Sequence, residues 1–338
     1  MRTAAVCLVV FAAACSDDSS SSPVAPTNPV APTTSGFILS GTVRDSRPNG
    51  PALAGATVRL DNGQSTAADP DGLYRFQNVS GAVTVTASGP YHVAGSATAT
   101  MDQDRTVDFA LEHTGLPPFE GTAFISLRLI DSADPSSLMN VTYSGRGMRE
   151  FWDRRAERWV TIEAYLFDVR YGWGSVEFQV NPEFGSADAA RVEVDTYAPA
   201  LGRLPAFLMT NAREVEISAV DAVFQGNEAG IFHIYTGEGE ELIRSGFLEE
   251  ALFHEAGHAS LDRHHKNSAG WREAQDTDGV FISEYARDNP DREDVAESIL
   301  PYWAVRYRPE RLTDADRSAI LTAIPNRLLY FDEQGFVN

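Results

Sequence analysis

The clearest chemical signature of this chain is the run His254-Glu255-Ala256-Gly257-His258, which has the pattern H-E-x-x-H. In a helix from Leu248 to Asp262, the two histidines would lie one turn apart on the same face. Two imidazoles in that arrangement can bind one zinc ion, and Glu255 can reach a water molecule bound to the ion. Four of the 7 histidines lie between residues 254 and 265. This clustering favours a metal site over a buried helix whose histidines only form hydrogen bonds.

A catalytic zinc ion takes three protein ligands and keeps a further position open for water. Both cysteines lie within the first 15 residues, so the third ligand must be a histidine or a carboxylate. His264 follows His254 by ten residues, as in the metzincin pattern H-E-x-x-H-x-x-G-x-x-H. Leu261 stands where that pattern has glycine, and no methionine follows Met209 to form a Met-turn. His264 is therefore the weaker candidate.

The other candidate ligand is a carboxylate in the stretch from Tyr285 to Glu297. Asn289-Pro290 is expected to open a helix, because proline fits the first turn. Glu293 and Glu297 are four residues apart and would share a face of that helix. One could bind the metal while the other orients a ligand histidine. Taken by itself, the pattern is explained more simply by acids at a solvated helix start.

The chain from His254 to Glu297 resembles the gluzincin metallopeptidases of the anthrax lethal factor and Mlc titration factor type. Those proteins carry H-E-x-x-H, an aspartate shortly after it, and then Tyr-Ala, a proline and Glu-x-x-Ala. The corresponding residues here are Asp262, Tyr285-Ala286, Pro290 and Glu293-Asp294-Val295-Ala296. The resemblance implies that Glu293 is the third zinc ligand and that Tyr285 stabilises the transition state. Asp262 and Glu297 would orient ligands or replace Glu293.

The chain departs from the family at two points, and the second of them keeps Glu297 open as the ligand. Asp262 comes one position later than in the family, and the gap from tyrosine to glutamate is one residue longer. The resemblance also implies a reaction, the hydrolysis of a peptide bond in a peptide or protein substrate. Glu255 would accept a proton from the zinc-bound water, and zinc and Tyr285 would stabilise the oxyanion. The segment Ile231–Thr236 is expected to lie either at a sheet edge that aligns a peptide or inside the sheet.

The pattern of residues 121–338 predicts an α+β domain. The resemblance implies that this domain is a zincin-like metallopeptidase domain. Strands come first, and the chain is mostly helical from Ser245 onward. Strands are expected at Ala123–Ile130, in two runs within Val160–Val180, and at Val215–Val220 and Ile231–Tyr235. Helices are expected at Met148–Glu157 and at Ala187–Tyr197, the latter with Ser186 as N-cap.

Residues 36–112 contain short alternating runs separated by turns, a pattern typical of an all-β sandwich. Strands are expected at Phe37–Val43, Ala56–Leu60, Leu73–Phe76, Val83–Ala87 and Thr106–Ala110. The runs at residues 40–43, 53–58 and 69–76 resemble the carboxypeptidase regulatory-like, or transthyretin-like, domain. The resemblance implies an accessory module without chemistry of its own. Residues 113–120, which contain Pro117-Pro118, are the expected linker.

The first 35 residues have the pattern of an export signal followed by a tether. Residues 1–15 resemble a bacterial lipoprotein signal peptide, because Arg2 precedes an apolar stretch too short for a membrane span and small residues precede Cys15. Cleavage before Cys15 and its lipidation are expected, with an ordinary signal peptide as the alternative. Residues 16–35 are rich in Ser, Pro and Thr and form the expected tether. The mature protein would then be extracytoplasmic and lipid-anchored to a bacterial membrane.

Charge and site together define the functions to be weighed. The formal net charge of -21 makes nucleic acid an unfavourable partner. The leading hypothesis is a surface-anchored zinc metallopeptidase with His254, His258 and Glu293 as ligands. One alternative is a metzincin-type peptidase that uses His264. The other is a non-catalytic surface binding protein, or adhesin, with a structural or degenerate metal site.

Overall fold

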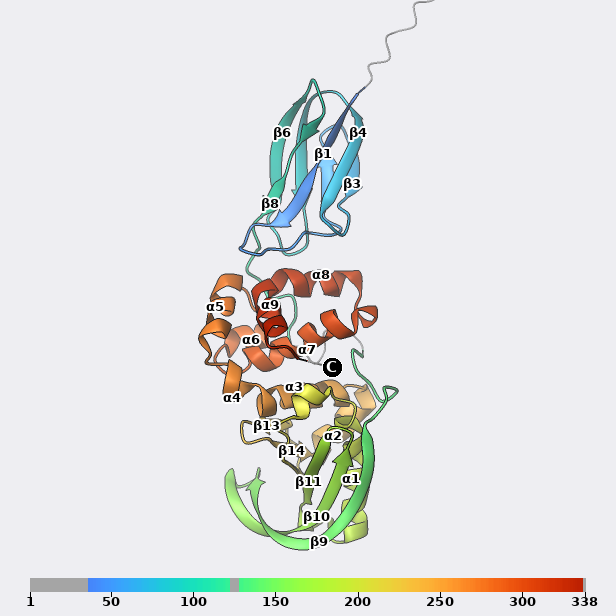
Figure 1. Cartoon of the computed structure of the whole chain (residues 1–338), viewed down its shortest axis with the longest axis vertical. Helices are drawn as coiled ribbons and strands as arrows, with labels where there is room; N and C mark the ends of the chain where they lie inside the picture. Colours follow the sequence, from blue (N-terminus) through green and yellow to red (C-terminus); the bar gives the residue numbers. More distant parts are fainter. Residues whose placement is uncertain (1–35, 122–127, 337–338) are drawn as a thin grey trace, which may run out of the picture. The chain divides into compact units, whose positions relative to one another are not determined.

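The computed structural model describes residues 36–121 and 128–336 (Figure 1). The predicted signal peptide with Cys15 and the predicted tether of residues 16–35 lie outside the described residues. The predicted strand at Ala123–Ile130 also falls largely outside them, and its described part, residues 128–130, forms a turn and bends. Within the described ranges, no helix is long and apolar enough to cross a bilayer.

Two β-sheets pack together in the N-terminal part of the described chain. In the first sheet, β1 (Phe37–Asp45) pairs with β4 (Leu73–Val79), β7 (Arg105–Thr106) and β8 (Phe109–Leu111). The second has the order β3 (Ser65–Ala67), β2 (Thr57–Leu60), β5 (Gly81–Ser88) and β6 (Gly95–Met101). Alternate residues, such as Val83, Val85 and Ala87 of β5, are buried in their common core. The β-sandwich predicted for this part is confirmed.

The strand predicted at Thr106–Ala110 is divided into β7 and β8. Asp108 at the break accepts hydrogen bonds from the amide and the hydroxyl of Thr42, at 2.8 and 2.9 Å. This side chain takes the place of a main-chain contact beside β1. The sequence does not predict β3 or β6, because their serine, threonine and alanine residues form no apolar run.

A six-stranded sheet, in the order β13-β14-β12-β11-β10-β9, begins the C-terminal part. The long hairpin of β9 (Leu138–Asp153) and β10 (Arg158–Tyr171) is followed by β11 (Gly174–Val180). Strand β12 (Glu214–Ser218) pairs in parallel with β11, and β14 (Ile231–Tyr235) pairs in parallel with β12. The short strand β13 (Gln225–Asn227) lies at the edge of the sheet, antiparallel to β14.

The helix predicted at Met148–Glu157 is wrong. Residues up to Asp153 complete β9, and the next four residues form the hairpin turn. β9 bends strongly along its length (Figure 1). Its pairing with β10 shifts register between Leu166 and Phe167, opposite Gly145, whose φ is 100°. A β-bulge with glycine in this conformation is a usual cause of such a bend.

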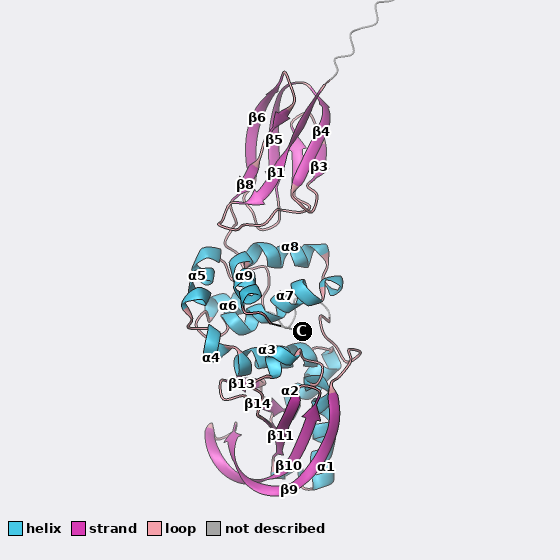
Figure 2. Cartoon of the chain, viewed as in Figure 1, coloured by secondary structure: helices cyan, strands magenta, loops and turns pink. Residues whose placement is uncertain are grey.

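Helices make up most of the chain after β14 (Figure 2). Before them, α1 (Ala187–Leu201) begins as predicted at Ser186, whose side chain accepts the amide of Ala189. The later helices are α2 (Thr236–Ser245), α3 (Leu248–Ser260), α4 (Asp262–His265), α5 (Ala269–Asp278), α6 (Glu284–Asp288), α7 (Asp294–Tyr307), α8 (Asp314–Ala323) and α9 (Pro325–Glu333). Short 3-10 helices lie at Pro182–Phe184, Ala206–Met209 and Pro309–Arg311. The order of strands followed by helices agrees with the predicted α+β class.

Glu250 is a fully buried carboxyl group on α3. One of its oxygens accepts the amide of Leu129 at 2.7 Å, and the other has no hydrogen-bond partner among the described residues. Burial raises the pKa of Glu250 to about 8. The folded protein therefore keeps a proton that the unfolded chain releases near its ordinary pKa of 4.5.

The ionisation of Glu250 is expected to affect how the free energy of unfolding depends on pH. Between the two pKa values the folded state binds more protons, so the free energy of unfolding falls as pH rises, by up to about 1.4 kcal/mol per pH unit from Glu250. Glu250→Gln should flatten that slope between about pH 5 and 7 in urea unfolding. Glu284→Gln, at an exposed acid, should leave it unchanged. An equal slope in wild type and Glu250→Gln would contradict the prediction.

Candidate metal centre

Helix α3 carries both histidines of the H-E-x-x-H run and packs closely on α7. A Cβ at residue 257 would lie only 3.1 Å from the Cα of Ala296 and 3.3 Å from Cγ2 of Ile299. Gly257 therefore permits this close approach, although glycine costs a helix about 1 kcal/mol relative to alanine. The approach brings the start of α7 beside His254 and His258.

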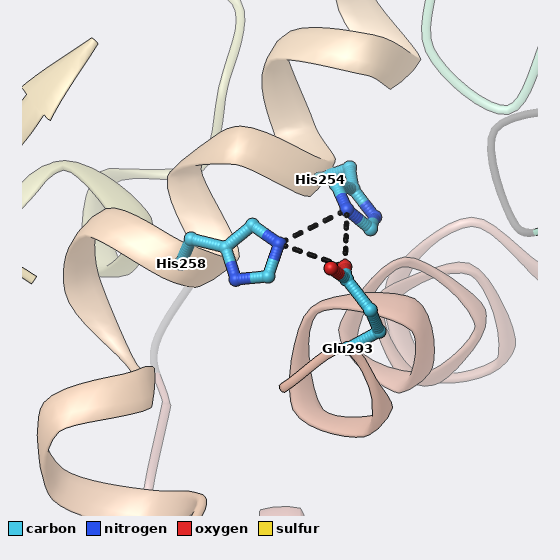
Figure 3. A group of neighbouring side chains, drawn as sticks. All are labelled: His254, His258 and Glu293. Atoms are coloured by element: carbon cyan, nitrogen blue, oxygen red, sulfur yellow. Dashed lines mark hydrogen bonds and ion pairs between the residues drawn. The ribbon is translucent and has the colours of Figure 1, made fainter. Parts of the chain in front are cut away.

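Both imidazoles turn toward the carboxylate of Glu293, the N-cap residue of α7 (Figure 3). Nε2 of His258 lies 3.0 Å from Oε2 of Glu293 and 3.2 Å from Nε2 of His254, and the third edge, from His254 Nε2 to Glu293 Oε2, is 3.3 Å. Ligands of a tetrahedral zinc ion, with bonds of about 2.0–2.2 Å, are roughly 3.3–3.6 Å apart. The two nitrogens and one oxygen thus have the chemistry and nearly the spacing that zinc needs.

Each of these histidines is fixed by a carboxylate at its other ring nitrogen. Nδ1 of His254 lies 3.2 Å from Oε1 of Glu297, and Nδ1 of His258 lies 2.9 Å from Oδ2 of Asp262. Such contacts hold a histidine so that Nε2 remains available as the metal donor. Only Glu293 of the two candidate glutamates faces both Nε2 atoms, whereas Glu297 is further held by the hydroxyl of Ser283.

His264 is not brought to this cluster. It is exposed in α4 and lines a separate small cavity with Asn211 and Arg213. Within the described residues, the group of donors close enough to share one ion consists of His254, His258 and Glu293. The geometry therefore argues against the metzincin alternative.

Carboxylates surround both histidines of the cluster and raise their pKa values. Burial alone would lower the pKa of His254, but its hydrogen bonds to Glu293 and Glu297 raise it well above its usual value. Burial would also lower the pKa of His258, but its hydrogen bonds to Asp262 and Glu293 raise the pKa to about 9. Burial would raise the pKa of Glu293, yet the two histidines hold it well below its usual range. A metal ion must displace the histidine protons, so its binding should strengthen as pH rises.

Glu255 is held against the edge strand β13. Its Oε2 accepts the amide of Gly226 at 2.5 Å. A Cβ at residue 226 would collide with the carbonyl oxygen of Glu255, so only glycine lets β13 lie this close to α3. Burial raises the pKa of Glu255, partly opposed by the nearby His254 and His258. A carboxylate with a raised pKa suits a proton acceptor at neutral pH.

The strand that lies at the sheet edge is β13, which the sequence does not predict. The segment Ile231–Thr236 instead contains β14, which is flanked by β12 and β13. Of the two positions expected for that segment, it therefore takes the one inside the sheet.

Tyr285 lies on α6 beside the cluster. Its hydroxyl donates to Oε1 of Glu293 at 3.2 Å. Nε of Arg292 donates to the same oxygen at 2.7 Å, and Nη2 of Arg292 lies 3.3 Å from the Tyr285 hydroxyl. Tyr285 is 42% exposed, so its ring reaches out from the cluster rather than into the core.

These groups share one cleft of about 710 Å³. Sequence reasoning missed several of its lining residues, namely Trp152, Trp159, Gly226, His233 and Arg292. Arg292 directly precedes Glu293, and this proximity is a signal that could have found it. The two tryptophans lie far from the other site residues in sequence, and nothing local connects them to the site.

The comparison with known families concerns the N-terminal sandwich. Residues 38–112 match the carboxypeptidase regulatory-like domain. The match covers most of the two packed sheets and confirms the resemblance seen in the sequence. It does not extend to residues 254–297, so the gluzincin resemblance stays a prediction.

Several solved structures are similar to part of the chain. The minor pilin GBS52 of Streptococcus agalactiae is 14% identical, with a TM-score of 0.21, and the match covers 25% of this chain and 47% of the pilin. The TIE protein of Bacillus anthracis is 11% identical, with a TM-score of 0.20 and coverage of 40% and 28%. A streptococcal ancillary pilin is 12% identical, with a TM-score of 0.20 and coverage of 44% and 59%. This chain therefore spans from 28% to 59% of these structures. No curated protein matches it.

Proposed function

We propose that residues 121–338 form a zinc-dependent metallopeptidase domain of zincin-like fold that hydrolyses peptide bonds. The observation that supports this function best is the spacing of 3.0 to 3.3 Å among the donor atoms of His254, His258 and Glu293. A half-buried carboxylate, Glu255, stands beside them on the same helix. Two histidines and a glutamate are a donor set used by catalytic zinc sites in peptidases.

A zinc ion held by His254, His258 and Glu293 would act as a Lewis acid on a water molecule and on the scissile carbonyl. Glu255 accepts the proton of the attacking water and returns it to the leaving amine. The amide of Gly226 holds Oε2 of Glu255 and leaves the other oxygen for this transfer. The hydroxyl of Tyr285, steadied by Arg292, donates to the developing oxyanion.

The substrate would lie along β13. The amide of Gly226 already donates to Glu255, so an extended peptide would pair with the other main-chain groups of this edge and pass close to the carboxylate. Main-chain addition to a sheet edge binds peptides with little dependence on their sequence. Side-chain selectivity must then come from the walls of the cleft.

The sequence pattern of residues 1–35 supports a location for this activity. We propose cleavage before Cys15, lipidation of that residue and attachment of the domain to a bacterial membrane outside the cytoplasm. The membrane would be a partner only through this anchor. With a net charge of -21, nucleic acid is not a partner under this proposal.

The second candidate function is a non-catalytic surface binding protein, with a structural or degenerate metal site. The comparisons found a carboxypeptidase regulatory-like domain and two pilins. These matches fit a surface binding protein better than a peptidase. It predicts a bound metal without hydrolysis, whereas the first function predicts both.

The two functions are separated by peptide cleavage. The full chain, loaded with one equivalent of zinc, is incubated with a proteome-derived peptide library, and new termini are identified by mass spectrometry. The peptidase proposal expects cleavage that stops with a chelator and returns when zinc is restored. Stoichiometric zinc without any cleavage would instead support the binding protein.

A further inference from the structure

The cleft differs in character at its two ends. Strand β13 passes the metal centre with Gly226 against Glu255. Val223 and Phe224 precede this strand and Glu228 follows it, and all three line the cleft. At about 3.3 Å per residue of extended chain, Phe224 and Val223 lie up to roughly 7–10 Å from Gly226, and Glu228 begins the turn on the other side of the strand. A peptide extended along β13 would therefore meet an apolar end on one side of the metal centre and a charged end on the other.

Two tryptophans form the wall of the apolar end. Trp152 and Trp159 are direct partners in the β9–β10 hairpin, and their rings meet edge to face with centroids 5.7 Å apart. Trp159 also meets the ring of His233 edge to face at 6.0 Å. Trp159 is 47% exposed and Val223 is 61% exposed. Aromatic and apolar surface is thus left open inside the cleft, where a ligand can cover it.

The wall is fixed before any ligand binds. The main-chain amide of Trp152 donates to Oε2 of the buried Glu216 at 2.9 Å, and Nδ1 of His233 lies 2.9 Å from the same oxygen. Arg155, in the hairpin turn, donates to the carbonyl of Ala219 at 2.7 Å. These bonds hold the end of the bent hairpin on β12 and β14, although β9 forms the opposite edge of the sheet (Figure 1). A wall ordered in advance loses little conformational freedom on binding.

The charged end offers no comparable selectivity. Nζ of Lys266 lies 2.5 Å from Oε1 of Glu228 and 3.8 Å from Oδ2 of Asp262. The charges of these side chains are therefore largely satisfied by one another. A charged substrate side chain would have to displace a partner already in place, whereas an apolar side chain at the other end displaces only water.

We infer that Trp152, Trp159 and His233 form a subsite that binds one aromatic or large apolar side chain of a peptide, within about three residues of the cleaved bond. This inference rests on the proposed function. Indole rings favour the edges and faces of other aromatic rings. Val223 adds exposed apolar surface to the subsite. An aromatic or apolar side chain of a peptide would cover this surface together with the tryptophan rings, so we take the occupant to be a peptide side chain.

Cleavage-site profiling tests the subsite. The zinc-loaded full chain should show Phe, Tyr, Trp, Leu or Met enriched at one fixed position near the cleaved bond. For a peptide with Phe there, Trp159→Ala should lower kcat/KM about tenfold or more, and for the same peptide with Ala there, less than about threefold. Trp159→Phe should restore most of the preference. Tyr143→Ala, at an aromatic residue of β9 that is 42% exposed and outside the cleft lining, should leave the profile unchanged.

A binding measurement separates this inference from the proposed function. Zinc-loaded Glu255→Gln protein is titrated with the Phe and Ala peptides, with and without Trp159→Ala. Tighter binding of the Phe peptide that is lost in Trp159→Ala would support the subsite, even if the wild-type chain cleaves no peptide. Absence of cleavage would contradict only the peptidase function. Cleavage with no aromatic preference, or with a preference unchanged in Trp159→Ala, would overturn the subsite and keep the peptidase. Trp159-dependent binding of oligosaccharides, with none of aromatic peptides, would also overturn it.

Discussion

Replacing Glu255 with glutamine is expected to remove nearly all peptidase activity while zinc binding is kept. An amide cannot accept the proton of the attacking water, and loss of a general base costs about 10²–10⁴-fold in rate. The amide has nearly the shape of the carboxylate, and its oxygen can still accept the N–H of Gly226. The donor atoms of His254, His258 and Glu293 are unchanged by this substitution.

The measurement is kcat/KM on a peptide found in the library, together with zinc content by mass spectrometry of the purified protein. Glu273→Gln, at an exposed acid of α5, is the matched control and should retain the wild-type rate. A zinc-loaded Glu255→Gln protein that cleaves at the wild-type rate would refute the role of Glu255 as base. Loss of zinc in parallel with activity would mean that Glu255 supports the metal site rather than the proton transfer.

The parts of the site that depend on local spacing are predictable from the sequence. The two histidines of α3 share a face because they are four residues apart, and this relation needs only that the segment be helical. The helix α1 is similar, since Ser186 caps it through a bond to a residue three positions later. Gly257 is also detectable, because glycine inside a helix suggests close packing before the partner helix is known.

The choice between Glu293 and Glu297 is not local. In a helix that opens at Pro290, both glutamates would share one face and be equivalent. Instead α7 begins at Asp294, and a turn precedes it in which the amide of Glu293 donates to the carbonyl of Asn289 at 2.9 Å. Glu293 at the cap meets both Nε2 atoms, whereas Glu297, one turn later, meets Nδ1 of His254. That difference depends on how α7 packs on α3, which no periodicity encodes.

The tryptophan wall is the least predictable feature. Trp152 lies in a segment whose charges suggest a helix, and only pairing with β10 makes it a strand. The wall exists because a bend in β9 returns the hairpin end to β12, where Trp152 meets Glu216. Sixty-four positions separate these two residues in the chain. Tertiary pairing of this range outweighs local propensity, as is common in strands.

Replacing Glu293 with glutamine is expected to cause the largest loss of zinc affinity of any single change among the carboxylates of the site. The variant loses the charged oxygen that lies 3.0 Å from Nε2 of His258, and affinity should fall by more than roughly 100-fold. Glu297→Gln and Asp262→Asn alter only the orientation of a ligand histidine, and each should cost about 10–100-fold. The measurement is competition with a chromophoric chelator of known zinc affinity.

His264→Ala is the matched control, because His264 is an exposed histidine close in sequence but outside the cluster. Its zinc affinity should equal that of the wild type, and thermal unfolding without metal should confirm that each variant is folded. A greater loss of zinc affinity in Glu297→Gln than in Glu293→Gln would mean that Glu297 is the ligand and Glu293 the orienting carboxylate. Loss of zinc in His264→Ala alone would restore the metzincin ligand set. The contacts predict the greatest loss for Glu293, smaller losses for Glu297 and Asp262, and no effect for His264. Of the three carboxylates, Glu293 is the one that faces both Nε2 atoms.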